Sequence, residues 1–152
     1  MLFRSDLLLV QFAASAAMAA IAWFVQVVHY PLFGRLDHEG EERRAYHAEN
    51  VRRTRPVVLV PMVAEALAAA WLAAISPAAI GRGPALAGLA LLAIALLSTA
   101  ILQVPLHGRL REAAPAEGTV RALVTTNWIR TAAWSMRAAL AAWMLRAFVA
   151  AG

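Results

Sequence analysis

Four apolar segments constrain this chain more than any other feature of its sequence. They cover residues 7–33, 56–79, 84–106 and 131–151, and each is long enough to cross a hydrocarbon core, which takes roughly twenty helical residues. Their residues are mostly Ala, Leu, Val and Ile, without the two-residue alternation of a membrane β-barrel. Since 62% of the chain is apolar, the sequence predicts an all-α integral membrane four-helix bundle, with residues 1–152 as a single domain.

The basic residues indicate how these segments are oriented. The chain has fourteen arginines, no lysine and a net charge of +5. We expect these arginines to contact membrane lipids and not nucleic acid, because most of them flank apolar spans. Under the positive-inside rule, the two long connections face the cytoplasm and both termini lie outside, in a multi-pass topology. The ten arginines on the predicted cytoplasmic side are Arg35, Arg43, Arg44, Arg52, Arg53, Arg55, Arg109, Arg111, Arg121 and Arg130.

Two short motifs occur twice, which indicates an internal duplication. The first is Pro-Leu-x-Gly-Arg-Leu, at 31–36 and 105–110, where spans one and three end. The second is Asn-x-x-Arg-Thr, at 50–54 and 127–131, before spans two and four. The sequence therefore predicts two repeated hairpins, related by an approximate two-fold axis along the membrane normal. A plain helix stop explains the Gly and Arg of the first motif equally well.

The connection before span two is itself expected to be helical. Acidic residues come early in residues 37–55 and arginines come late, which is the order that complements a helix dipole. This cytoplasmic helix would continue into span two, and Pro61 would kink that span beside Glu65.

Polar residues recur inside the apolar segments at helical spacing. Ionisable side chains are costly in a membrane, so we expect these residues to face the bundle interior or a wet cavity. The register brings Glu65 of span two near Arg137 of span four, where they can form an ion pair. Such a pair can serve catalysis or simply clamp two helices, and the sequence leaves both alternatives open. The full set is Gln26, His29, Glu65, Gln103, His107, Asn127, Arg130, Trp134 and Arg137.

Histidines gather toward the predicted cytoplasmic face, and they raise the question of a cofactor. If a metal or haem were bound, its ligands would come from His29, His47, His107 and Glu65. The chain lacks His-x-x-x-His and Glu-x-x-His pairs, so no cofactor is favoured, although haem or a metal stays an open alternative. His29 fits a hydrogen-bond donor or general base better.

Several of these motifs together resemble the anthrone-oxygenase-like family of small four-span membrane proteins. The resemblance rests on Gln103-Val104-Pro105-Leu106, on Asn127-x-x-Arg130-Thr131, and on Pro31-Leu32 closing span one. It implies a four-helix membrane bundle and oxygenation of a polycyclic aromatic anthrone. This chain departs from the family pattern in having His107, where Asn is more usual, and His29-Tyr30 before Pro31.

The sequence therefore favours a membrane enzyme for a lipophilic aromatic or quinone-like small molecule that enters between helices near the cytoplasmic face. His29 and His107 would move protons, and Arg130 would stabilise an oxyanion. Further ligand contacts are expected from Gln26, Tyr30, Glu65, Gln103, Asn127, Trp134 and Arg137. The alternatives are a non-catalytic binding or transport component, a haem- or metal-binding protein, and a polar cluster that only holds the bundle together. Alanine-rich faces such as Ala66–Ala70 would permit a homo-oligomer.

Overall fold

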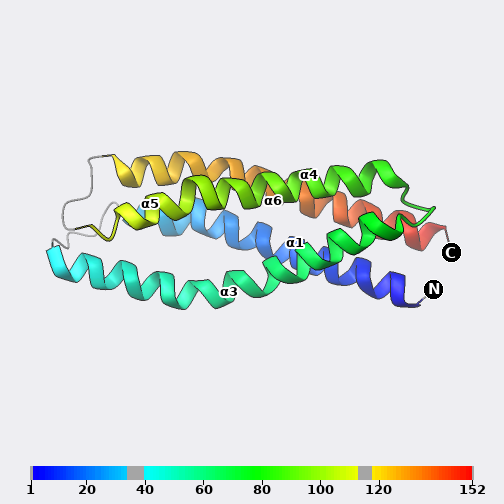
Figure 1. Cartoon of the computed structure of the whole chain (residues 1–152), viewed down its shortest axis with the longest axis horizontal. Coiled ribbons are helices and arrows are strands. Elements are labelled where there is room, and N and C mark those ends of the chain that lie inside the picture. The colour runs from blue at the N-terminus through cyan, green and yellow to red at the C-terminus, as the bar shows by residue number, and fades with distance from the viewer. Residues whose placement is uncertain (1, 34–39, 113–117, 152) are drawn as a thin grey trace.

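The computed structural model describes residues 2–33, 40–112 and 118–151, and these residues form four long helical stretches with no strand among them. All four run along one axis (Figure 1). The first stretch is α1 (Leu2–Phe24), η1 (Val25–His29, a π-helical segment) and α2 (Tyr30–Phe33); the second is α3 (Gly40–Ile75); the third is α4 (Arg82–Ser98), η2 (Thr99–Gln103, also π-helical) and α5 (Val104–Arg109); the fourth is α6 (Thr119–Ala150).

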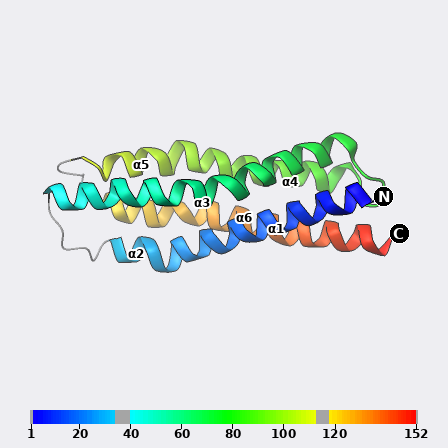
Figure 2. The ribbon, with the colours of Figure 1, turned by 90° about the horizontal axis from the view of Figure 1, so that it is seen from below.

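The four stretches form a closed ring of neighbours. α1 packs against α3 and α6, and α4 packs against the same two helices. α1 begins and α6 ends at the end of the bundle where α3 passes to α4 (Figure 2). A central apolar cluster holds the ring together, with Trp134 of α6 beside Met18 and Ala22 of α1 and Leu92 of α4.

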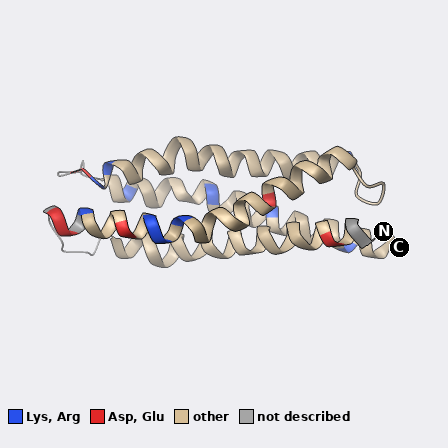
Figure 3. Ribbon diagram, turned by 60° about the horizontal axis from the view of Figure 1, so that its bottom comes forward, with Lys and Arg blue, Asp and Glu red and all other residues tan. Residues whose placement is uncertain are grey.

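Three of the four stretches are long and apolar enough to cross a membrane: Ser5–Phe33, Arg44–Ile75 and Arg82–Arg109. Large apolar side chains point outward along them, such as Val60 and Leu67 on α3, which are 71% and 68% exposed. The fourth predicted span lies on α6, which is also continuous but more polar, since it contains four arginines: Arg121, Arg130, Arg137 and Arg146. Much of the charge gathers at the end where α3 begins and α5 ends (Figure 3).

The second predicted span is too long at its carboxyl end, because α3 stops at Ile75 and not at residue 79. Pro77 explains the difference, since a proline disfavours helical geometry in the residue before it. That residue, Ser76, has a φ of 35°, and its hydroxyl donates a hydrogen bond to the carbonyl of Ala73 (2.8 Å). The first connection is helical from Gly40 onward, and the predicted part at 37–39 lies outside the described residues.

Both π-helical segments lie just before a proline of the repeated motif. η1 ends at His29, two residues before Pro31, and η2 ends at Gln103, two residues before Pro105. Proline has no N–H and its ring clashes with the carbonyl four residues earlier in a regular helix. A widened turn relieves that clash, and the next N–H groups, of Tyr30 and Val104, bond five residues back. The two copies of the Pro-Leu-x-Gly-Arg-Leu motif thus share a local backbone structure as well as a sequence. Their origin in a duplicated hairpin stays a prediction.

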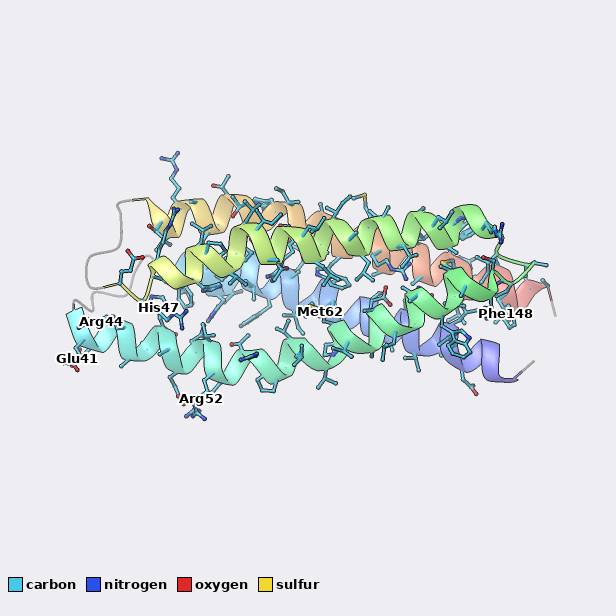
Figure 4. All side chains as sticks on the ribbon, in the orientation of Figure 1. Glu41, Arg44, His47, Arg52, Met62 and Phe148 are labelled. Carbon is cyan, nitrogen blue, oxygen red and sulfur yellow. The ribbon has the colours of Figure 1, made fainter. Side chains whose placement is uncertain are left out.

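α3 contains two prolines, Pro56 and Pro61, and it changes direction about where Met62 is labelled in Figure 4. Proline removes a helical hydrogen bond and crowds the preceding turn, which is the usual cause of such a bend. The sequence assigns such a kink to Pro61, and its position beside Glu65 stays a prediction.

A buried ion pair lies at the centre of the bundle. The Arg137 guanidinium of α6 donates to the Glu65 carboxylate of α3, and both side chains are almost fully buried. The amide oxygen of Gln11 on α1, in the orientation that the hydrogen bonds require, also accepts from Arg137. Gly88 of α4 leaves the space for this guanidinium, because a Cβ at Gly88 would lie 2.9 Å from its Cζ. One residue from each helical stretch therefore meets at this point.

We expect Gly88→Ala to destabilise the bundle by about 1–3 kcal/mol, because the added methyl overlaps a guanidinium that is already fixed by Glu65. Thermal unfolding in mild detergent, followed by tryptophan fluorescence, measures the effect. Gly83→Ala on the same helix is the matched control, since a Cβ there meets no atom within 4 Å. Equal melting temperatures for the two variants would contradict this account of Gly88.

Candidate functional site

A pocket opens between η1 and the first half of α3, toward the arginine-rich end of the bundle. Its volume is about 170 Å³, and a second pocket of about 330 Å³ adjoins it, sharing Val25, His29, Thr54 and Val58. The larger one alone reaches the size range of small-molecule sites, about 300–1,000 Å³. The smaller, deeper pocket is lined by Val25, His29, Tyr30, Asn50, Val51, Thr54, Arg55, Val58, His107 and Arg130.

The mouth of these pockets combines apolar side chains with one exposed arginine, Arg53. The adjoining pocket is lined by Ile21, Phe24 and Val57, and the Phe24 and Val57 side chains are 58% and 61% exposed on the outer surface of the bundle. The opening therefore lies on the side of the bundle between α1 and α3.

A chain of hydrogen bonds runs from the deep pocket into α6. The Tyr30 hydroxyl lies 3.0 Å from Nε2 of His107 and 3.3 Å from Oε1 of Gln103. The Gln103 amide then donates to the Thr126 hydroxyl (3.0 Å), which donates to the carbonyl of Ala122 (2.7 Å). The chain thus joins the first, third and fourth helical stretches behind the pocket.

The donors and acceptors in this series of hydrogen bonds determine which atom carries each hydrogen. The Thr126 hydrogen is used on the Ala122 carbonyl, so Gln103 must present its NH₂ to Thr126 and its oxygen to Tyr30. Because that oxygen only accepts, the single Tyr30 hydrogen goes to Gln103. His107 then donates its Nε2–H to Tyr30, and in the neutral imidazole this leaves the lone pair on Nδ1.

Arg130 forms part of the pocket wall, and it is unusual in being a buried charge without an acidic partner among the described residues. Its side chain is only 8% exposed, and its Nε has no hydrogen-bond partner. No carboxylate among the described residues forms an ion pair with it, whereas Arg137, two turns further along α6, has Glu65. Buried charges are normally paired, so Arg130 is the group here best placed to bind something external.

A second hydrogen-bonded group lies behind the pocket, between η1 and α6. Asn127 donates to the side-chain oxygen of Gln26 (2.8 Å), and Gln26 donates to the backbone carbonyl of Val124 (3.1 Å). The Thr131 hydroxyl completes the group by donating to the Asn127 carbonyl (3.1 Å). These bonds fix the η1 segment against α6.

The structure divides the predicted site residues into three groups. His29, Tyr30, His107 and Arg130 line the deep pocket together. Gln26, Gln103 and Asn127 belong to the hydrogen-bonded groups behind it. The predicted ligand contacts Glu65, Arg137 and Trp134 lie elsewhere, the first two in the central ion pair and Trp134 in the apolar cluster.

Residues of α3 make up the part of the pocket that the sequence prediction missed. They are Asn50, Val51, Thr54, Arg55 and Val58. A signal for two of them was present, because Asn50 and Thr54 are the first and last residues of the repeated Asn-x-x-Arg-Thr motif. The valines carry no such signal, since an apolar residue in a membrane helix is expected on any face.

The four residues considered as metal or haem ligands do not form one cluster. Phe33 packs between two of the histidines, with ring centroids 4.4 Å from His29 and 4.8 Å from His47, and Glu65 is bonded to Arg137. His47 points from α3 toward the bundle, while Arg52 points away (Figure 4). Among the described residues, no three His, Cys, Asp or Glu side chains are grouped so that they could hold a metal ion.

Comparisons with protein families, with curated proteins and with solved structures find no match to this chain. The resemblance to the anthrone-oxygenase-like family therefore stays a prediction.

Proposed function

We propose that this protein is a membrane-embedded enzyme that takes a lipophilic aromatic or quinone-like small molecule from the bilayer and acts on it in the pocket between η1 and α3. One observation carries the proposal: a largely apolar pocket with a lateral mouth is lined by His29, His107 and an unpaired, buried Arg130. A base and a cation on the wall of an apolar cavity suit proton removal beside an oxygen that becomes negative.

The reaction that fits best is oxygenation of an anthrone-type compound. His29, which lines both pockets, would remove the proton from the central-ring carbon. Arg130 would stabilise the resulting enolate oxygen. Molecular oxygen then oxidises this electron-rich carbanion, so that anthrone and O₂ give anthraquinone and water. In this scheme Tyr30 and Gln103 hold His107 in one tautomer at the edge of the pocket.

The same proposal includes the full membrane arrangement, with α6 as a fourth crossing. α6 buries Asn127, Thr131 and Arg137, while the exposed Arg121 and Arg146 lie near its two ends, so the outer face between them can meet lipid. The arginine-rich end would face the cytoplasm and both termini the outside.

Single cysteines test this topology, because the chain has none of its own. We expect a membrane-impermeant maleimide to label Ala78→Cys and Ala151→Cys in intact cells and to label Glu112→Cys only after lysis; all three positions are exposed. The reverse pattern would invert the orientation. If Ala151→Cys and Glu112→Cys were both labelled in intact cells, or both only after lysis, α6 would not cross the membrane.

Filling the pocket should abolish binding of a neutral aromatic probe. We expect Val58→Trp, at a position shared by both pockets, to raise the Kd for anthrone at least tenfold in detergent micelles, measured by equilibrium dialysis against protein-free micelles. Val60→Trp is the matched control, since Val60 lies on the same helix and is 71% exposed. An equal loss of anthrone affinity in both variants, or no anthrone binding by the unaltered protein, would refute the proposal that this pocket binds the ligand.

Catalysis is tested separately from binding. We expect His29→Gln to lower the rate of anthrone conversion to anthraquinone at least a hundredfold, with a change in Kd of less than about threefold, because a general base contributes about 10²–10⁴ in rate. Unaltered turnover in His29→Gln would remove His29 from this role. Binding without turnover in the unaltered protein would favour the alternative, a non-catalytic binding component.

A further inference from the structure

Two arginines are buried among the described side chains, and they differ in one respect. Arg137 has the carboxylate of Glu65, whereas Arg130 has no acidic partner and an Nε without any hydrogen bond. A guanidinium carries five N–H donors and stays charged in proteins. Taking such a group out of water is costly unless an anion compensates it.

The surroundings of Arg130 make an anion the matching ligand. Among the described residues that line the deep pocket there is no Asp or Glu, and Arg55 adds a second positive charge. The Tyr30 hydroxyl is engaged by His107 and Gln103, and as a neutral group it does not compensate the positive charge of Arg130. Three valines, Val25, Val51 and Val58, give the wall an apolar part beside the polar His29, Asn50 and Thr54, and this part suits an apolar body.

We infer that the pocket selects a lipophilic monoanion: an apolar ring system whose single oxyanion, of the carboxylate or phenolate type, binds the Arg130 guanidinium while the rings lie against Val25, Val51 and Val58. The inference rests on the proposed pocket and concerns molecules that already carry the oxyanion that the proposed reaction would create on neutral anthrone. The Arg130 side chain is the determinant of selectivity for the charged ligand over a neutral ligand of the same shape.

A matched pair of fluorescent probes tests this selectivity. Anthracenecarboxylate, with its carboxylate on the central ring, and its uncharged methyl ester share the same ring system. Binding is measured at pH 7 in uncharged detergent with about 0.5 M salt, which screens adsorption to the exposed arginines. The unaltered protein should bind the anion at least tenfold more tightly than the ester.

Three variants localise the effect. Arg130→Met keeps the side-chain length without charge, and it should raise the Kd for the anion at least tenfold while changing that for the ester less than threefold. Arg130→Lys should retain a preference for the anion, reduced because lysine lacks the planar fork. Arg121→Met, at an exposed position on the same helix, should change neither Kd.

Equal binding of both probes by the unaltered protein, or a preference that survives Arg130→Met, overturns the inference. In either case the pocket itself still stands if Val58→Trp abolishes ester binding. If neither probe binds to the unaltered protein, the proposed pocket fails and the inference fails with it.

Discussion

The arrangement of this bundle depends on the buried ion pair between Glu65 and Arg137. In a low-dielectric interior each of these charges is unfavourable without the other, so α3 and α6 are restricted to the register in which the two groups meet. Gln11 on α1 and the missing side chain at Gly88 on α4 adapt the other two helices to the same guanidinium. The pair thus sets the axial position of all four helices, and through α6 it sets the depth of Arg130.

The pocket follows from how the helices leave that central point. α3 bends about where Met62 lies, and η1 replaces regular helix in α1 ahead of Pro31. Neither helix is straight between the ion pair and the arginine-rich end, and their side chains leave space there for the two pockets. The bonds from Asn127 to Gln26 and from Gln103 to Thr126 keep the opposite wall fixed.

Helical periodicity was enough to predict which polar residues face inward, because an ionisable group in an apolar helix has few other places to go. Asn127, Arg130 and Arg137 are buried on one side of α6 as expected, and the pairing of Glu65 with Arg137 followed from counting turns. The same reasoning could not separate Glu65 and Trp134 from the pocket, since burial alone does not distinguish core from ligand site. The fit of Gly88 depends on a tertiary contact with Arg137 that no local pattern encodes.

The lateral mouth between Phe24 and Val57 has a consequence for how affinity should be understood. In the proposed bilayer setting, the relevant concentration of a ligand is its concentration among the lipid chains, which is set by its partition coefficient. A modest intrinsic affinity would then suffice for high occupancy by a strongly partitioning molecule, and water-soluble analogues with identical contacts would bind poorly. Rankings of ligands measured in aqueous solution would mix solubility with recognition until each is corrected for partitioning.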